Sequence, residues 1–288
     1  MGRLYVVGTP IGNLEDVTYR AVRVLGEVPL ILAEDTRHSR KLLSRYGIGG
    51  RLMSYHQHNK NSRLDMTLAA LEHGDVALIS SAGMPSISDP GFELIAAAVQ
   101  RGIEVDVLPG PSAVVTAVVG AALPAPGFVF HGFLPRQRTH KRARLRMLSG
   151  LQLVTVLYES PHRLVDTLEE IRAVMGERSL VLARELTKLH QEYVRCTVSD
   201  AIEKYCRQEP QGEFTIVIAP GEPPSPEHNL AEARNEVLRR RLEGENRRAV
   251  LKHISEQFGI PRNDAYAMWI EAEDDQQQSD ERDSPVGE

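Results

Sequence analysis

The sequence predicts an α/β fold of two α/β domains, followed by a small helical segment. Short apolar runs alternate with stretches of helical periodicity over the first 125 residues. A second set of apolar runs follows a break at residues 124–127, and the pattern turns helical after the proline-rich residues 220–226. Such β-α alternation is typical of a mostly parallel sheet covered by helices. We expect domains at 1–124 and 125–222, a helical segment at 229–272 and an acidic disordered tail at 273–288.

Four apolar runs of strand length lie in the first domain, and three of them are followed closely by glycine or proline. These strands are expected at Leu4–Val7, Leu30–Ala33, Val76–Ile79 and Val105–Leu108. Between the first two, apolar residues recur at helical spacing before Gly26, where a helix would end.

The second domain contains a higher share of strands. We expect them at Phe128–Phe130, Leu153–Tyr158, Leu180–Ala183, Val194–Val198 and Phe214–Ile218, with a helix at Arg163–Val174. The C-terminal helices are expected at Leu230–Leu242, Arg248–Phe258 and Asn263–Ala272. The last two flank a glycine-containing turn, which fits either a helix-turn-helix or a small helical cap.

Composition and charge favour a cytosolic protein. Two cysteines, Cys196 and Cys206, are too few for a disulfide framework and lack zinc-ligand spacing. The first residues do not resemble a signal peptide, and the longest apolar stretch is too short to span a bilayer. The net charge is −5, but eight acids and one arginine lie between Glu271 and Glu288, so the remainder carries +2. This tail is either solvated and disordered or a binding element.

Three glycine-rich turns follow strands of the first domain, at residues 7–12, 80–85 and 109–113. One such turn alone is an ordinary strand-to-helix loop. Three at the carboxyl edge of one sheet favour a ligand cleft, because ligands bind there and small residues admit them close to the backbone. The glycines match neither the dinucleotide nor the phosphate-loop pattern.

Polar runs follow other strands. Charged groups follow strands at residues 34–37, 158–163 and 183–188. They are either site residues or ordinary helix caps and surface ion pairs. His56 and His58 have a spacing that could bind a metal, but no third ligand is evident, so we expect no metal. An acid-free basic run extends from Pro135 to Arg146 and suits either RNA phosphates or a solvated helix face.

In series, these motifs resemble a known family. The runs VGTPIGNLEDVTYRA, ILAEDTR, SAGMPSISDPG, LPGPSA, YESPHRL, ARELTKLH and GEFTIVI occur in this order between Leu4 and Ile218. They resemble the family of the ribosomal RNA small subunit methyltransferases I, in the tetrapyrrole-methylase superfamily. LPGPSA would be shared with the corrin and sirohaem methylases, whereas AEDTR, YESPHRL and ARELTKLH indicate the ribosomal RNA branch.

The resemblance implies two α/β domains of the tetrapyrrole-methylase type with S-adenosylmethionine in the cleft between them, and a homodimer. The implied reaction is methylation of the ribose 2′-hydroxyl of a cytidine in the decoding region of 16S RNA, within the 30S subunit. The cofactor residues it implies are Pro10, Ser81, Ala82, Gly83, Ile87, Ser112, Ala113, Tyr158, Glu159 and Phe214. The expected RNA-binding residues are Arg37, Arg136, Arg138, Lys141, Arg142 and Arg163.

For the proton of the ribose hydroxyl, Glu185 and Lys188 are the catalytic candidates, since they share one turn after a strand. Lys188 is expected to act as a base only if burial lowers its pKa, and otherwise to orient the ribose. The family usually has Asp in place of Ser81 and Glu in place of Gln57, so this chain lacks two charges near the cleft. The alternatives are a tetrapyrrole methylase and a ribosome-assembly factor without catalysis.

Overall fold

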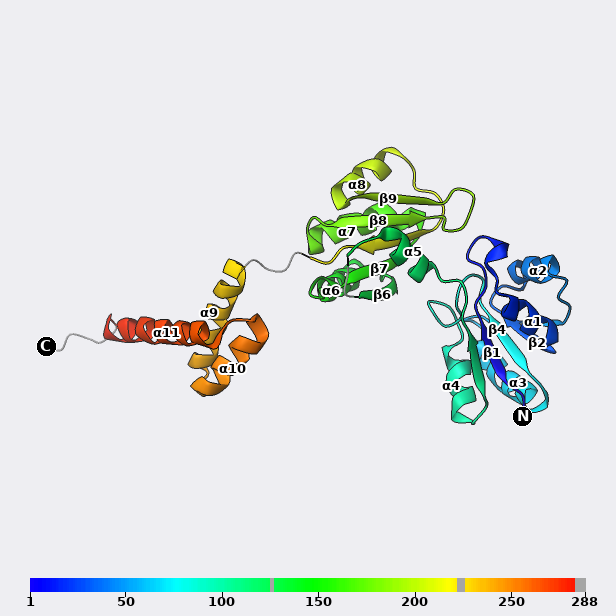
Figure 1. Ribbon diagram of the computed structural model, residues 1–288, viewed down its shortest axis with the longest axis horizontal. Coiled ribbons are helices and arrows are strands. Elements are labelled where there is room, and N and C mark those ends of the chain that lie inside the picture. Colours follow the sequence, from blue (N-terminus) through cyan, green and yellow to red (C-terminus); the bar gives the residue numbers. More distant parts are fainter. Residues whose placement is uncertain (125–126, 222–225, 283–288) are drawn as a thin grey trace. The chain divides into compact units, whose positions relative to one another are not determined.

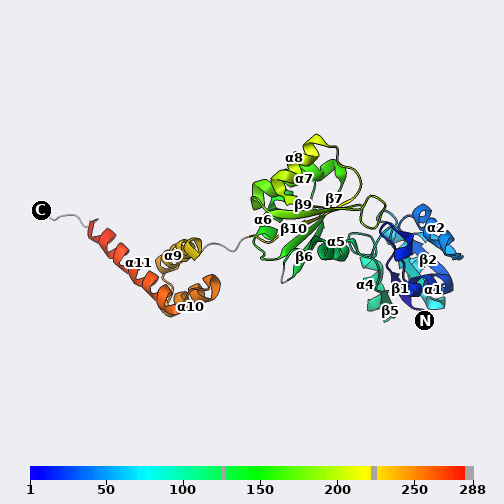
Figure 2. The same cartoon turned by 45° about the horizontal axis from the view of Figure 1, so that its top comes forward.

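The computed structural model describes residues 1–124, 127–221 and 226–282, with only the backbone for 226–229 and 273–282. The chain divides into two compact units, residues 1–221 and 222–288. The first unit contains two five-stranded sheets with their covering helices (Figures 1 and 2). Within the described residues, no helix is both long and apolar enough to cross a membrane.

The first sheet is parallel throughout, with the strand order β3-β2-β4-β1-β5. Its strands are β1 (Leu4–Val7), β2 (Leu30–Ala33), β3 (Arg51–Ser54), β4 (Val76–Ile79) and β5 (Val105–Leu108). Four of these have the predicted bounds. The strand that was not predicted, β3, lies at the edge of the sheet and is only partly apolar.

Helices cover both faces of this sheet because its inner strands β1, β2 and β4 are apolar on both sides. They are α1 (Tyr19–Glu27), α2 (Thr36–Arg45), α3 (Lys60–His73) and α4 (Phe92–Gln100), preceded by the short helix η1 (Leu14–Asp16). In β2, Leu30 and Leu32 join the core formed with α3 and α4, whereas Ile31 and Ala33 join the core formed with α1 and α2. This two-residue alternation is expected of a strand buried on both faces.

The second sheet is mixed, in the order β6-β7-β10-β8-β9, and only its β6–β7 pair is parallel. Its strands are β6 (Phe128–Phe133), β7 (Val154–Glu159), β8 (Ser179–Arg184), β9 (Glu192–Thr197) and β10 (Phe214–Ile218). One face packs against α6 (Arg138–Ser149), α7 (Leu164–Met175) and α8 (Val198–Arg207), and the short helix η2 (Pro161–Arg163) precedes α7.

The other face of the second sheet is covered by α5 (Ala113–Ala121). Val114 and Ala117 of α5 share a core with Val156 of β7 and Val217 of β10. The predicted domain boundary near residue 124 places these residues in the first domain. By packing, the chain changes sheets earlier, in the turn after β5.

The C-terminal unit consists of α9 (Pro226–Leu242), α10 (Arg247–Phe258) and α11 (Arg262–Arg282) around its own apolar core (Figure 1). Gly259 adopts φ +67° and ends α10 before Pro261, as the predicted turn requires. Helix α11 continues to Arg282, ten residues into the segment expected to be disordered. Those residues contain neither glycine nor proline, so nothing local stops the helix. The remainder of that tail, 283–288, lies outside the described residues.

Candidate functional site

Two adjoining pockets lie beyond the carboxyl ends of the strands of the first sheet. The first, of about 420 Å³, is lined by both Lys41 and Lys188, and we call it the lysine pocket. The second, of about 400 Å³, contains Tyr158 and is called the tyrosine pocket. Ile11, Ala82 and Glu213 line both pockets, so ligands bound in the two pockets would be separated only by these shared walls.

The three predicted glycine-rich turns meet at these pockets. Thr9 and Gly83 exchange backbone hydrogen bonds of 2.9 and 3.0 Å, which tie the turn after β1 to the turn after β4. The turn after β5 approaches just as closely, since a Cβ on Gly8 would lie 3.1 Å from the Cα of Gly110. The prediction that the turns share one sheet edge is confirmed.

All ten residues expected at the cofactor line one of the two pockets. Pro10 and Ser81 line the lysine pocket and Ala82 lines both. The other seven line the tyrosine pocket: Gly83, Ile87, Ser112, Ala113, Tyr158, Glu159 and Phe214.

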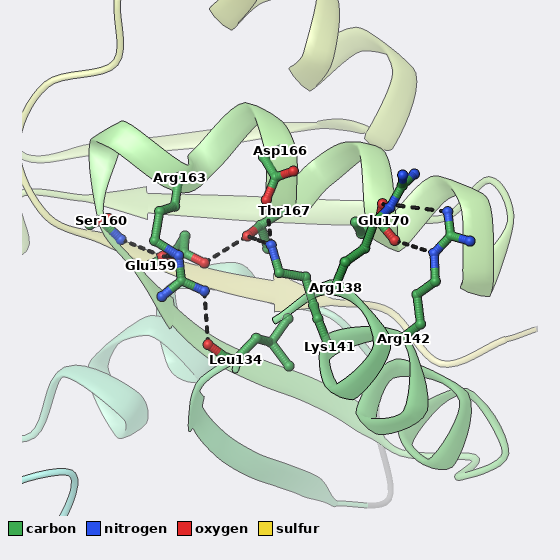
Figure 3. A network of polar contacts seen from close by, with 10 residues as sticks. All are labelled: Leu134, Arg138, Lys141, Arg142, Glu159, Ser160, Arg163, Asp166, Thr167 and Glu170. Carbon is green, nitrogen blue, oxygen red and sulfur yellow. Dashed lines mark hydrogen bonds and ion pairs between the residues drawn. The ribbon is translucent and has the colours of Figure 1, made fainter. Parts of the chain in front are cut away.

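Glu159 supports the wall of the tyrosine pocket rather than offering its charge to a ligand. Its carboxylate is buried and lies in a polar network (Figure 3). It accepts hydrogen bonds from the backbone N–H of Ser160 at 2.8 Å and from the Thr167 hydroxyl at 2.7 Å. The Arg163 guanidinium lies 3.5 Å from it and donates to the carbonyl of Leu134 at 2.8 Å. Arg163, expected to contact RNA, thus fixes the loop after β7.

Asp89 is a wall residue of the tyrosine pocket that the site prediction missed, although it lies in the SAGMPSISDPG run. Burial raises the pKa of its carboxyl to about 7, and the Glu34 charge adds to this, while a hydrogen bond from Ser80 opposes it. Burial also raises the pKa of Tyr158 to about 12, helped by the Asp89 charge. The pocket therefore holds a carboxyl that changes charge near neutral pH.

Ser81, where the family usually has Asp, donates its hydroxyl to Oε2 of Glu34 at 2.8 Å. The Ser81 backbone N–H lies 3.3 Å from the same oxygen. With its proton engaged by Glu34, the Ser81 oxygen can act only as an acceptor toward the lysine pocket. A carboxylate therefore does lie beside Ser81, that of Glu34, which directly follows β2.

Glu185 and Lys188 form an ion pair rather than an acid–base pair tuned to neutral pH. The Lys188 ammonium lies 2.8 Å from carboxylate oxygens of both Glu185 and Glu213. Burial lowers the Lys188 pKa, but these two hydrogen bonds outweigh it and the pKa is raised. For Glu185, burial raises the pKa, whereas hydrogen bonds from Lys188 and the Glu213 backbone leave it lowered. Lys188 therefore stays protonated, and Glu185 is not among the residues that line either pocket.

The basic run on α6 differs from its expected role, because three of its cations bind α7 (Figure 3). Arg138 and Arg142 each contact the buried Glu170 carboxylate at 2.6 Å. Lys141 is only 2% exposed and is paired with Asp166. An interior ammonium cannot reach a phosphate, so the RNA-binding prediction for Lys141 is wrong, and Arg138 and Arg142 share the single carboxylate of Glu170.

Arg37 and Arg136 remain available. Both side chains are exposed, and neither forms an ion pair with a described residue. The His56 and His58 rings lie 5.9 Å apart, and no third ligand joins them to form a metal-binding group among the described residues.

Comparison with known proteins agrees with this geometry. Residues 3–202 match the family model of the tetrapyrrole (corrin/porphyrin) methylases. The ribosomal RNA small subunit methyltransferase I of Thermotoga maritima is 48% identical over 220 residues, which cover 76% of this chain and 99% of that protein. The protein of that name from Synechocystis sp. is 42% identical over 278 residues, covering 96% and 100% of the two chains.

Solved structures show the same fold at low sequence identity. Cobalt precorrin-4 methyltransferase has a TM-score of 0.58 at 18% identity, over 75% of this chain and 94% of its own. The uroporphyrin-III C-methyl transferase of Thermus thermophilus, complexed with S-adenyl homocysteine, has a TM-score of 0.55 at 19% identity, over 76% and 97%. With the family model matched over most of the chain and relatives above 40% identity, this protein belongs to the tetrapyrrole methylase family and, within it, to the family of ribosomal RNA small subunit methyltransferase I.

Proposed function

We propose that this protein transfers a methyl group from S-adenosylmethionine to the ribose 2′-hydroxyl of a cytidine in the decoding region of 16S RNA. The observation that carries the proposal is the pair of adjoining pockets, one for a methyl donor and one for a nucleotide, with shared walls. The names of the relatives supply the substrate class. The 30S subunit is then the partner, and the cytosol is the compartment.

The tyrosine pocket fits S-adenosylmethionine in size and chemistry. Its volume of about 400 Å³ lies within the range of small-molecule sites. Asp89 and Glu213 bring carboxylates to its wall, which suits a ligand with a permanent sulfonium charge, and Tyr158 and Phe133 bring aromatic rings. When bound there, the cofactor supplies an electrophilic methyl group.

In this proposal the residues of the chain align the hydroxyl and remove its proton. Asp89 is the proton acceptor, because an efficient base has a pKa near the working pH and Glu185 does not. Lys188 stays charged and orients the ribose or an adjacent phosphate from the lysine pocket. Holding the hydroxyl in line with the methyl group supplies much of the rate.

The same proposal includes a homodimer. On α5, Val115 and Val119 are exposed on one helix face, as expected of a surface that another subunit covers. Sedimentation of the purified protein should give the mass of two chains, and a single-chain mass would contradict this part alone.

The deciding experiment is a mass map of ribose methylation in 16S RNA from cells with and without this protein. One cytidine should lose its methyl group, and the purified protein with S-adenosylmethionine should restore it. An unchanged map would exclude the proposed activity. Methylation of uroporphyrinogen in a parallel assay would favour the tetrapyrrole alternative.

A further inference from the structure

We propose that α2 is the surface that holds the RNA backbone, with Arg37, Arg40, Lys41 and Arg45 contacting phosphates beside the lysine pocket. The inference rests on the proposed function and specifies where the RNA lies. It also replaces the sequence-based assignment of that role to α6.

The first observation is the charge pattern of α2. Its sequence, TRHSRKLLSR, contains four arginines and lysines and no acid. At 3.6 residues per turn, Arg37, Arg40 and Lys41 lie on one face, with Arg45 at its margin. The opposite face carries the buried residues Ser39, Leu42 and Leu43. The cations therefore form an exposed stripe about 12 Å long, at 1.5 Å of rise per residue.

The second observation is that these four cations form no ion pair with any residue in the described parts of the chain, and all four are exposed. The nearest acid in sequence, Asp35, is engaged as the helix cap and accepts the backbone N–H groups of Arg37 and His38. On α6, by contrast, Glu170 and Asp166 pair with three of the cations, and only Arg144 and Arg146 have no acidic partner among the described residues. A stripe without ion pairs attracts a polyanion more strongly than one whose cations are mostly paired.

The third observation is continuity with the site. His38, Ser39, Lys41 and Leu42 of α2 form part of the wall of the lysine pocket. A strand bound along α2 thus has a nucleotide within reach of the pocket next to the methyl donor. This favours single-stranded RNA over a lipid surface, because sequence-specific enzymes act on RNA bases and riboses in opened segments. Phosphate contacts of this kind set register without reading sequence.

The test compares R37A/R40A/R45A with R144A/R146A/R172A. The control removes the same number of exposed arginines from α6 and α7. Affinity for the 30S subunit is measured at several salt concentrations for the two variants and the unaltered protein. The α2 variant should bind more weakly, and its log–log salt slope should fall by about two, at about 0.7 per phosphate contact on single strands. The control should match the unaltered protein.

Affinity for S-adenosylmethionine and melting temperature report folding, and both should be unchanged in the two variants. Equal losses of subunit affinity in both variants would mean that only the total positive charge matters, and would overturn the inference. Normal subunit binding by the α2 variant would also overturn it. Lost binding to phosphatidylserine vesicles with normal subunit binding would assign the stripe to a membrane. Failure of the unaltered protein to methylate RNA would instead refute the proposed function.

Discussion

Replacing Asp89 by Asn should abolish the pH dependence of methyl transfer. With a carboxyl pKa of about 7, roughly a tenth of the protein carries the ionised base at pH 6 and roughly nine tenths at pH 8. The kcat/KM of the unaltered protein should therefore rise about tenfold over this range. Asp89→Asn should lower kcat/KM by about 10²–10⁴-fold, the usual contribution of a general base, and give a flat profile.

Glu34→Gln is the matched variant, because the Glu34 charge is a secondary cause of the raised Asp89 pKa. It should retain the rate at pH 8 and move the midpoint of the profile to lower pH. The midpoint should not reach the ordinary Asp value, since burial is the larger cause. The assay is transfer of radiolabelled methyl groups to 30S subunits, with each variant's melting temperature as the folding control.

The stability of Asp89→Asn gives an independent check. A carboxyl whose pKa is raised by folding favours the folded state fully at pH below its unfolded value, and that contribution is lost as pH rises through about 7. The Asn variant should therefore gain most melting temperature relative to the unaltered protein at pH 8, less at pH 5, and none below the unfolded pKa of 3.8. A variant with normal rate, or one that keeps the inflection near pH 7, would refute Asp89 as the base.

Three further substitutions test other parts of the structure. Ser81→Asp would place a second carboxylate beside that of Glu34, and repulsion between the two should lower the melting temperature more at pH 8 than at pH 4; an unchanged melting temperature would contradict this. Lys141→Met should leave urea-unfolding stability within about 1 kcal/mol or increase it, because a buried ammonium with an exposed partner is poorly compensated, and subunit affinity should not change. Gly120→Ala should destabilise by about 1–3 kcal/mol, since its Cβ would lie 2.3 Å from the Tyr193 ring; an unchanged melting temperature would argue against that packing.

Most of the first sheet could be predicted from the sequence because its inner strands are continuous apolar runs between turns. The edge strand β3 was missed because Arg51 and Ser54 interrupt that pattern where one flank faces solvent. The sequence did not indicate which sheet α5 covers, because AVVTAVVGA is apolar around most of its circumference.

The pocket residues followed from motifs, but the chemical state of the charged groups did not. Asp89 owes its raised pKa to burial and to Glu34, which comes from another strand. Likewise, the acids that pair with cations of α6 lie on α7, 25 to 32 residues along the chain. Local composition shows which charges are present, whereas the packing of helices decides which of them remain unpaired.

The position of α5 on the second sheet has a consequence for synthesis on the ribosome. The first sheet and its helices are encoded before residue 109 and can assemble as the chain emerges. Helix α5 follows at once, yet its central partner β10 begins at Phe214, about 90 residues later. At about 5–20 residues per second, an apolar helix waits roughly 5–20 seconds for the strand that buries it. During that interval the nascent chain exposes an apolar helix next to a finished domain, the kind of surface that aggregates unless chaperones cover it.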